Sequence, residues 1–221
     1  MLPNLNNHKM KILVACEESQ AITKELRKLG HEAYSCDLLP CSGGHPEWHI
    51  QGDAIKEAYS GKWELMVAHA PCTYLSVSGS RWLYNKDGSK NEDRWKNRSE
   101  ALDFVQLLMD APIDKIAIEN PVSVISSEIR KPDQIVQPWM FGDEASKKTC
   151  FWLKGLPKLE ATDIVGKGEF FEWTDKKGKK KRQALWYYNA LSIAKTPEER
   201  RTLRSKTFMG MARAIANQWT R

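Results

Sequence analysis

Short apolar runs alternate with amphipathic segments along most of the chain. Residues 11–15 (KILVA) form a continuous apolar run, which is typical of a strand buried on both faces. Residues 19–29 instead place apolar side chains at helical spacing, and Gly30 follows the last of them. Strands that alternate with helices predict an α/β protein with a doubly wound, mostly parallel sheet. The further strands predicted in this way are residues 32–36, 64–69, 115–118, 134–137 and 149–153.

Helices and loops fill the remainder of the pattern. A short helix is predicted to start at residues 52–54, a longer one covers 98–109, and a final one covers 208–219. The loop at 38–51 is rich in Pro and Gly, and residues 79–97 are polar, charged and aperiodic, which predicts a mobile loop. We therefore expect one catalytic domain over residues 10–221, preceded by a polar, flexible N-terminus at residues 1–9 that lacks a signal-peptide apolar region.

The last quarter of the sequence has a different character. Residues 166–183 (GKGEFFEWTDKKGKKKRQ) contain two aromatic or polar stretches around the turn at 175–178, which predicts a basic β-hairpin. This hairpin lies within a segment at 160–195 that carries no other predicted element. Thr196 and Glu199 have the spacing of a capping box, so a helix is expected to begin there.

The composition limits the possible classes of protein. A length of 221 residues allows one domain with a sizeable core. The chain has 34 Lys and Arg against 28 Asp and Glu, and this net charge of +6 favours a polyanionic partner. No apolar stretch is long enough to cross a membrane. The five cysteines include no C-x-x-C pair, which is typical of reduced thiols in a cytoplasmic protein rather than of a disulfide framework.

Reactive side chains follow the predicted strands. Asp37, Cys72 and Glu119 each come soon after a strand, where the ligands of doubly wound sheets bind. A thiolate that adds to C6 of a pyrimidine, with a carboxylic acid at N3, makes C5 nucleophilic. Cys72 is the candidate thiol, against the alternative of a small buried apolar residue. Glu119 is the candidate acid, with a pKa raised by desolvation, against the alternative of a solvated carboxylate.

A zinc site is the less favoured interpretation of a second group of residues. Cys36, Cys41, His45 and His49 have the spacing C-x4-C-x3-H-x3-H. Structural zinc sites usually have two tight pairs around a longer loop, and the middle gap here is short. We therefore predict no metal, and expect the histidines to line a loop near the cofactor or substrate.

Two motifs resemble those of the cytosine-C5 DNA methyltransferase family. Residues 71–79 (PCTYLSVSG) are similar to its nucleophile motif, and residues 118–121 (IENP) are similar to its Glu-Asn motif, with Pro121 where Val is usual. Order and spacing agree over nearly the whole chain, and residues 205–218 resemble the closing helix. The resemblance implies a Rossmann-like methyltransferase fold and transfer of a methyl group to C5 of cytosine in DNA. The catalytic residues that it implies are Cys72, Glu119 and Asn120.

The same resemblance implies S-adenosylmethionine as the cofactor. Residues 34–37 (YSCD) resemble the segment that holds the ribose, and residues 52–53 (GD) resemble the segment that contacts the adenine. The family's first loop is glycine-rich, but residues 16–20 (CEESQ) contain no glycine and two carboxylates. Taken alone, the two aspartates could equally be turn or helix caps. The residues expected at the cofactor are Cys16, Glu18, Asp37, Leu38, Asp53, Ala70, Pro71, Ser205 and Thr207.

Basic segments are the expected contacts to the substrate. Residues 147–155 (KKTCFWLKG) resemble the family's strand that reaches the target base, with Lys148 in place of the usual arginines. The large target-recognition domain of the family is reduced here to residues 160–195. Within it, residues 176–182 (KKGKKKR) lie among aromatic residues, which suits phosphate contact and base stacking. The residues expected at the substrate are Ser76, Ser78, Arg81, Lys148, Lys179, Lys180, Lys181 and Arg182.

Three functions compete at this point. The first is a small, phage-like enzyme that methylates an extruded cytosine in double- or single-stranded DNA. The second is an enzyme that modifies C5 of a free pyrimidine nucleotide, which the small recognition segment and the glycine-free loop favour. The third is an inactive nucleic-acid-binding protein of the same fold. The sequence does not indicate an oligomeric state.

Overall fold

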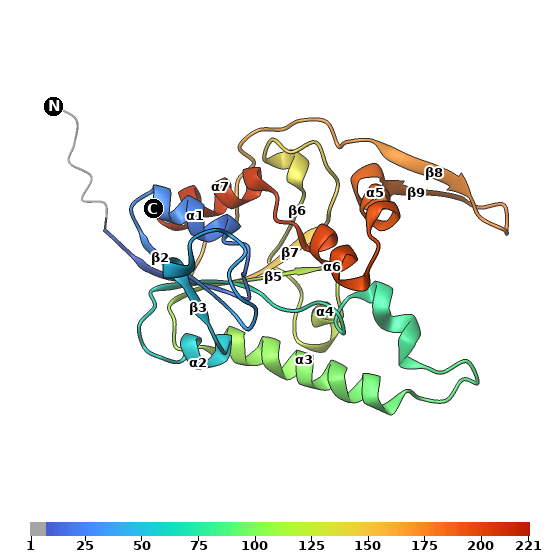
Figure 1. Cartoon of the computed structure of the whole chain (residues 1–221), viewed down its shortest axis with the longest axis horizontal. Coiled ribbons are helices and arrows are strands. Elements are labelled where there is room, and N and C mark those ends of the chain that lie inside the picture. The colour runs from blue at the N-terminus through green and yellow to red at the C-terminus, as the bar shows by residue number, and fades with distance from the viewer. Residues whose placement is uncertain (1–7) are drawn as a thin grey trace.

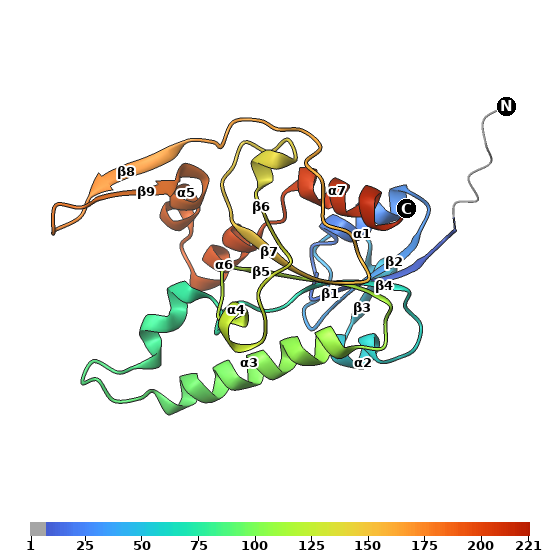
Figure 2. The same cartoon turned by 180° about the vertical axis from the view of Figure 1, so that it is seen from behind.

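A seven-stranded sheet with helices on both faces forms the centre of the molecule (Figure 1, Figure 2). The computed structural model describes residues 8–221, apart from the side chains of residues 197, 198 and 201. The predicted flexible N-terminus therefore lies outside the described residues, except for His8 and Lys9. None of the helices in the described part of the chain has the length and apolar character that crossing a bilayer requires.

The sheet is mostly parallel, as predicted. Its order is β3-β2-β1-β4-β5-β7-β6, and only β7 runs antiparallel to its neighbours. The chain moves outward from β1 to β3 and then returns to place β4 on the other side of β1, so the direction of winding reverses between β1 and β4. Ligands of open α/β sheets bind at such a switch point, beyond the carboxyl ends of the strands. The strands are β1 (Lys11–Ala15), β2 (Glu32–Asp37), β3 (His49–Gln51), β4 (Leu65–His69), β5 (Lys115–Pro121), β6 (Gln134–Val136) and β7 (Thr149–Lys154).

Two helical layers bury the two faces of the sheet. Alternate side chains of β1 enter opposite cores: Ile12 packs with α1 (Ala21–Lys28) and α7 (Met209–Trp219), and Leu13 packs with α2 (Ala54–Ala58) and α3 (Glu92–Asp110). Figure 1 shows the same division, with α1 and α7 on one side of the sheet and α2 and α3 on the other. This alternation follows from the two-residue period of a strand, and it makes β1 apolar on both faces.

Residues 79–97 are largely ordered into helix, so the prediction of a mobile loop is wrong. A 3₁₀ helix, η2, covers Val77–Leu83, and α3 begins at Glu92 rather than at residue 98. The Asn91 side chain caps α3 by accepting a hydrogen bond from the Arg94 backbone N–H at 3.1 Å. The first turns of α3 bury little apolar surface, which explains why they lack helical periodicity.

The predicted basic hairpin is present in the last quarter of the chain. Strands β8 (Phe170–Thr174) and β9 (Lys180–Ala184) pair antiparallel, and they extend away from the main sheet in both views (Figure 1, Figure 2). The predicted capping box is also present, at the start of α6 (Pro197–Ser205). Among the strands and α-helices of the described residues, those that were not predicted are β3, α4 (Ile125–Glu128) and α5 (Leu185–Ile193).

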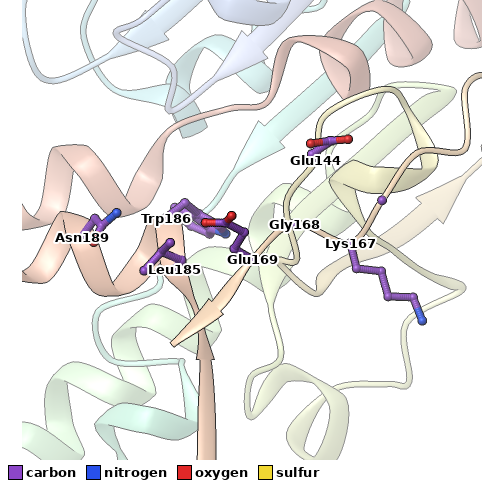
Figure 3. A pocket seen from close by; sticks show the side chains of 8 residues that line it. Glu144, Lys167, Gly168, Glu169, Leu185, Trp186 and Asn189 are labelled. Atoms are coloured by element: carbon purple, nitrogen blue, oxygen red, sulfur yellow. The ribbon is translucent and has the colours of Figure 1, made fainter. Parts of the chain in front are cut away.

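A cavity of about 530 Å³ lies where the root of the hairpin meets α5 (Figure 3). Its wall carries the carboxylates of Glu144 and Glu169 together with Trp186 and Asn189. The Trp186 indole N–H donates to the backbone oxygen of Ser146 at 3.2 Å, which ties α5 to the segment before β7. The wall also includes Lys167, so it carries charges of both signs.

Candidate active site

Hydrogen bonds tie the segment that carries Cys72 to the end of the neighbouring strand. Cys72 is solvent-exposed, and its backbone oxygen accepts hydrogen bonds from the N–H groups of Leu75 (3.1 Å) and Ser76 (2.9 Å). The side chain of Asn120, at the end of β5, is fully buried and donates from Nδ2 to the oxygen of Ala70 at 2.7 Å. The ends of β4 and β5 are thereby held in a fixed relation at the carboxyl edge of the sheet.

Glu119 forms an ion pair with His69, a residue that the sequence analysis did not select. The two residues are directly paired in the register of β4 and β5, and His69 Nδ1 lies 3.0 Å from Glu119 Oε2. Both side chains are largely buried, with 18% and 16% of their surface exposed. The only sequence signal for His69 was a polar residue at the end of an otherwise apolar strand, immediately before the Pro-Cys segment.

The His69 pair reverses the expected protonation of Glu119. Burial raises the pKa of the carboxyl group, but the hydrogen bond and charge of His69, together with the charge of Lys147, outweigh it and hold the pKa below its ordinary value. The expectation that desolvation would raise this pKa is therefore wrong. Burial lowers the pKa of His69, yet the hydrogen bond and charge of Glu119 and the charge of Glu17 raise it above its ordinary value. The imidazolium form is favoured beside a carboxylate.

The thiol of Cys72 is surrounded by charges of both signs. Desolvation and the negative charge of Glu119 raise its pKa, and Lys147 and Arg204 act in the opposite direction. The negative charge of Glu119 thus opposes ionisation of the Cys72 thiol. A thiol with a raised pKa is a weak nucleophile until it loses its proton, so a base or a bound substrate must promote ionisation.

Lys147, rather than Lys148, is the basic residue of this segment that acts on the site. Lys147 donates from Nζ to the backbone oxygen of Lys206 at 3.3 Å, and its charge lowers the pKa of both Cys72 and Glu119. The charge of Lys148, which is exposed, acts on Cys150 instead. Both lysines precede β7, so no strand periodicity in the sequence indicated which of them faces the site.

Helices α5 and α6 bring two further side chains toward Cys72. The Arg204 guanidinium lies 4.9 Å from the centre of the Tyr187 ring, and both residues interact electrostatically with Cys72. Arg204 Nε is buried and has no hydrogen-bond partner among the described residues. Tyr187, from the segment at residues 160–195, and Arg204, from α6, therefore lie near Cys72, and Arg204 adds a positive charge there.

The serines and arginines after Cys72 differ in their partners and in their exposure. Ser76 and Ser78 share a hydrogen bond between their hydroxyls at 3.2 Å. Arg94 donates from Nη2 to the oxygen of Thr73 at 3.3 Å, which fixes the same turn. Arg81 stacks on the neighbouring Trp82 at 4.6 Å and is exposed. Substrate contact by the two serines and by Arg81 stays a prediction.

Three of the residues expected at the cofactor gather at the ends of β1 and β2. Burial raises the pKa of Cys16 to about 12, with further effects from the charges of Asp37, Cys36 and Asp53. The aspartates each cap a turn: Oδ1 of Asp37 accepts from the N–H of Leu39 at 2.9 Å, and Oδ1 of Asp53 accepts from the first turn of α2 at 2.8 Å. Each carboxylate keeps a second oxygen for a ligand hydroxyl or amine.

The glycine-free loop takes glycine-like backbone conformations. Cys16 and Gln20 have positive φ angles of 59° and 57°, a region that L-residues adopt only when their surroundings require it. Glu17 turns inward and accepts hydrogen bonds from the N–H of Ile22 at 2.7 Å and the hydroxyl of Thr23 at 2.7 Å. The carboxylate of Glu17 is thereby directed to the start of α1, so it does not face a ligand at the end of β1.

The other residues expected at the cofactor lie around the same edge. Glu18 accepts from the N–H of Ser42 through its backbone oxygen at 2.9 Å, and Leu38 is 75% exposed beside Asp37. Ala70 is buried and Pro71 is exposed before Cys72. Ser205 ends α6 and Thr207 lies between α6 and α7, on either side of the residue whose oxygen holds Lys147. No cofactor contact of these residues is shown, and each stays a prediction.

The basic residues of the hairpin are exposed on β9 and its turn. The backbone N–H groups of Lys177 and Lys179 donate to Oδ1 of Asp175 at 2.9 and 3.0 Å, which closes the turn. Lys180, Lys181 and Arg182 project from a strand that carries few apolar side chains. Phe171 stacks on Tyr188 at 4.0 Å and anchors the hairpin to α5.

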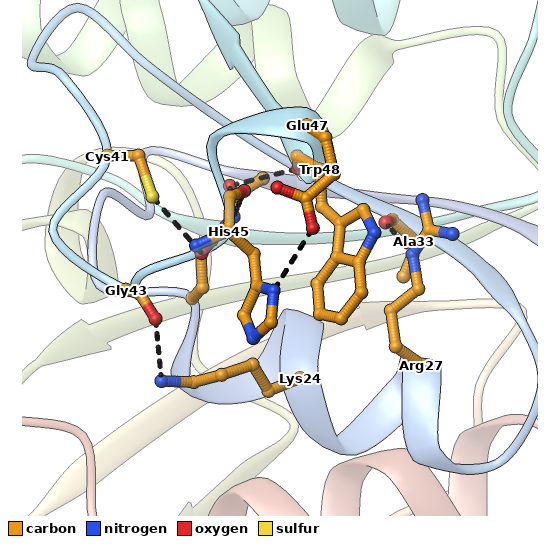
Figure 4. Close-up of polar contacts among 10 residues, drawn as sticks. Lys24, Arg27, Ala33, Cys41, Gly43, His45, Glu47 and Trp48 are labelled. Atoms are coloured by element: carbon orange, nitrogen blue, oxygen red, sulfur yellow. Dashed lines mark hydrogen bonds and ion pairs between the residues drawn. The ribbon is translucent and has the colours of Figure 1, made fainter.

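The four residues considered for zinc have other partners. Cys41 donates its thiol to Oε1 of Gln20 at 3.1 Å, and the ring of His45 stacks on Trp48 at 3.8 Å (Figure 4). Both ring nitrogens of His49 are hydrogen-bonded, at 2.8 and 3.0 Å. Among the described residues, no group of three or more His, Cys, Asp or Glu side chains is placed to hold a metal ion.

A basic cavity of about 440 Å³ lies next to these residues. Its wall includes Lys24 and Arg27 from α1, which Figure 4 shows, together with Lys9 and His31. Since Lys9 precedes β1 and His31 precedes β2, this cavity lies at the amino ends of the strands. It is therefore separate from the Cys72 site, which lies beyond their carboxyl ends.

Comparison with known proteins gives distant likenesses to solved structures. No family model matches the chain, and no curated protein matches it. A solved structure of a protein described as a DNA modification methyltransferase encoded within a prophage (E. coli) is 11% identical to it, with a TM-score of 0.44. The match covers 82% of this chain and 64% of that protein, so the chain spans less than two thirds of its length. Likeness at this level does not define the function of the chain.

Proposed function

We propose that this protein methylates C5 of cytosine in DNA, with Cys72 as the nucleophile and Glu119 as the acid. The observation that carries the proposal is the placement of an exposed thiol and a buried carboxylate at the ends of two adjacent parallel strands, coupled by charge. A pyrimidine ring can meet both groups at once at such an edge. The motifs at residues 71–79 and 118–121 support the same chemistry.

The chemistry divides between the two side chains. The Cys72 thiolate forms a bond to C6, and the electron pair displaced from the ring is stabilised when N3 accepts a proton from the Glu119 carboxyl group. Asn120 holds the two strand ends through its bond to Ala70, so the sulfur and the acid keep their relative positions. Because a thiolate cannot reach C6 inside a base stack, the cytosine must be extruded from a duplex or come from a single strand.

The edge at β1 and β2 fits S-adenosylmethionine. Asp37 at the end of β2 occupies the position that binds ribose hydroxyls in doubly wound folds, and Asp53 and the exposed Leu38 lie beside it. The inward turn of Glu17 removes one of the two carboxylates that would repel the cofactor. When bound there, the cofactor supplies the methyl group. The strand order supports the Rossmann-like methyltransferase fold that this assignment needs.

The hairpin and α5 are the proposed contacts to DNA. Lys180, Lys181 and Arg182 are exposed on β9 and have the charge that phosphates require. Only two strands and a helix lie between residues 160 and 195, so the surface available for reading bases is small. We therefore expect a short target sequence or a preference for single strands, as in a small phage-like enzyme.

A mononucleotide substrate is the alternative that this small surface favours. Nucleosides are analysed by mass spectrometry after incubation of the protein and S-adenosylmethionine with duplex DNA, single-stranded DNA or dCMP. The proposal predicts 5-methyldeoxycytidine from DNA, whereas product from dCMP alone would contradict it. DNA that contains 5-fluorocytosine should form a covalent adduct with the wild type and with Cys41→Ser, but not with Cys72→Ala. Binding of DNA with no adduct and no product would leave only a binding protein.

A further inference from the structure

A row of ionisable side chains lies along the carboxyl edge of the sheet. Glu17 follows β1, His69 ends β4, Glu119 lies on β5, and Lys147 precedes β7. The charges of Glu17 and Glu119 both act on His69, and the charge of Lys147 acts on Glu119. His69 is the centre of this row, and it uses only one ring nitrogen for a hydrogen bond. Its Nε2 atom is buried and has no partner among the described residues.

The stability of the fold does not explain this pair. Desolvation of two charges costs several kcal/mol per ion, and apolar residues of similar volume often stabilise such a position equally well. The remainder of β4 is apolar and fully buried, so a fifth apolar side chain at position 69 would continue the core. A titratable residue in contact with the proposed acid, three positions before the nucleophile, therefore points to the chemistry.

We propose that His69 is a positioning residue that orients Glu119 and holds the proton that Glu119 passes to the base. This inference rests on the proposed function. The geometry that carries it is the 3.0 Å contact between Nδ1 and Oε2, the register of β4 and β5, and the burial of both side chains.

The proton balance of the step is simple. Before reaction, the pair of His69 and Glu119 shares one proton, as imidazolium and carboxylate. The Cys72 sulfur forms a bond to C6, and the C5=C6 and C4=N3 electron pairs shift toward N3. The shared proton moves from Nδ1 to the Glu119 carboxyl group, which donates a proton to N3, so His69 becomes neutral and Glu119 remains a carboxylate. Once C5 carries the methyl group, a solvent base removes the C5 proton, the C5=C6 double bond re-forms and the Cys72–C6 bond breaks to give back the thiolate. N3 then returns its proton to the pair.

The pair of His69 and Glu119 predicts that activity falls at high pH. The groups that face His69 are Glu119 on β5, Glu17 in the loop after β1 and Lys147 before β7, and the first two favour its protonated form. The folded-state pKa of His69 is raised, so the pair keeps its proton until the pH exceeds that raised value. Activity should then fall, because no acid remains for N3.

The test uses His69→Gln, in which the amide can still donate to Glu119 but carries no titratable proton. We expect kcat/KM for methyl transfer to fall by about 10²-fold, the typical size of an acid–base effect. The high-pH limb of the pH profile should move to lower pH by at least about one unit, because a carboxyl group ordinarily titrates about two units below imidazole. His8→Gln, which removes an imidazole that is 72% exposed before the amino end of β1, should match the wild type.

A second measurement covers the case in which His69→Gln does not fold. In ¹⁵N-histidine NMR of the wild type, one imidazole should titrate above the usual range, and that signal alone should move down in Glu119→Gln. A wild type that neither methylates nor forms a 5-fluorocytosine adduct would overturn the proposed function. A wild type that methylates, with an unshifted His69 signal or an unchanged pH profile in His69→Gln, would overturn only the role of His69.

Discussion

Removal of the Asn120 side chain should lower both stability and activity. Its Nδ2 atom donates to the oxygen of Ala70 at 2.7 Å, and the side chain is fully buried between the ends of β4 and β5. In Asn120→Ala the Ala70 carbonyl loses this donor in a place that water does not reach, which costs roughly 1–3 kcal/mol. The Asn120 Oδ1 atom has no partner among the described residues, so its removal offsets part of that cost. We expect a net loss of about 2 kcal/mol.

Urea unfolding followed by tryptophan fluorescence measures this loss directly. For a chain of this size, about 2 kcal/mol corresponds to a fall in Tm of roughly 4–8 °C. Activity should fall further, by about 10²-fold, because displacement of the Pro71-Cys72 segment by about 1 Å misaligns the sulfur with C6. Alkylation of Cys72 by iodoacetamide should persist, since its exposure does not depend on Asn120.

The control is Asn85→Ala, which removes an exposed hydrogen bond to Ser89 of 3.0 Å. Its free energy of unfolding should stay within about 0.5 kcal/mol of the wild type. If Asn120→Ala unfolds as the wild type does and methylates at the same rate, the two strand ends do not depend on this bond, and the reasoning fails.

Three further predictions test the packing, the hairpin and the cofactor edge. In urea unfolding, Gly210→Ala should lower the free energy of unfolding by about 3 kcal/mol, because the added Cβ would overlap a backbone carbonyl. The control Gly52→Ala has open space around the added Cβ and should change the free energy of unfolding by less than about 0.5 kcal/mol. Lys180→Gln with Lys181→Gln should reduce the slope of log K against log salt for DNA by roughly 2 in fluorescence anisotropy, and an unchanged slope would exclude phosphate contact by this strand. Cys16, with a pKa of about 12, should resist iodoacetamide at pH 8 and react faster as the pH rises toward that value. Rapid labelling of Cys16 at pH 8, detected by peptide mapping, would contradict its burial among negative charges.

The catalytic candidates could be selected from the sequence because they follow strands with a clear apolar pattern. Parallel strands place their carboxyl ends at one edge, so Cys72 and Glu119 were expected together before any coordinates. His69 and Lys147 were missed because their roles depend on which face of the sheet they meet and on their neighbours there. The direction of the shift in the Glu119 pKa was predicted wrongly for the same reason. The apolar strand before Glu119 indicated its burial, but the sequence did not indicate its histidine partner.

The sequence by itself determined most of the strands and helices and the edge at which the candidate site lies. Apolar runs indicate which segments are buried, and turn residues indicate where those segments end. Both are local properties of the chain. It also determined the basic hairpin and the capping box at Thr196, which depend on residues only a few positions apart.

Only the tertiary structure decided the charge state of the site, the inward turn of Glu17 and the start of α3 in a polar segment. It also decided that β7 runs antiparallel, and that α5 and α6 bring Tyr187 and Arg204 toward the thiol. These features arise between segments far apart in the chain, where distance, burial and mutual charge set the energies. The local pattern of residues along the sequence does not predict those contacts.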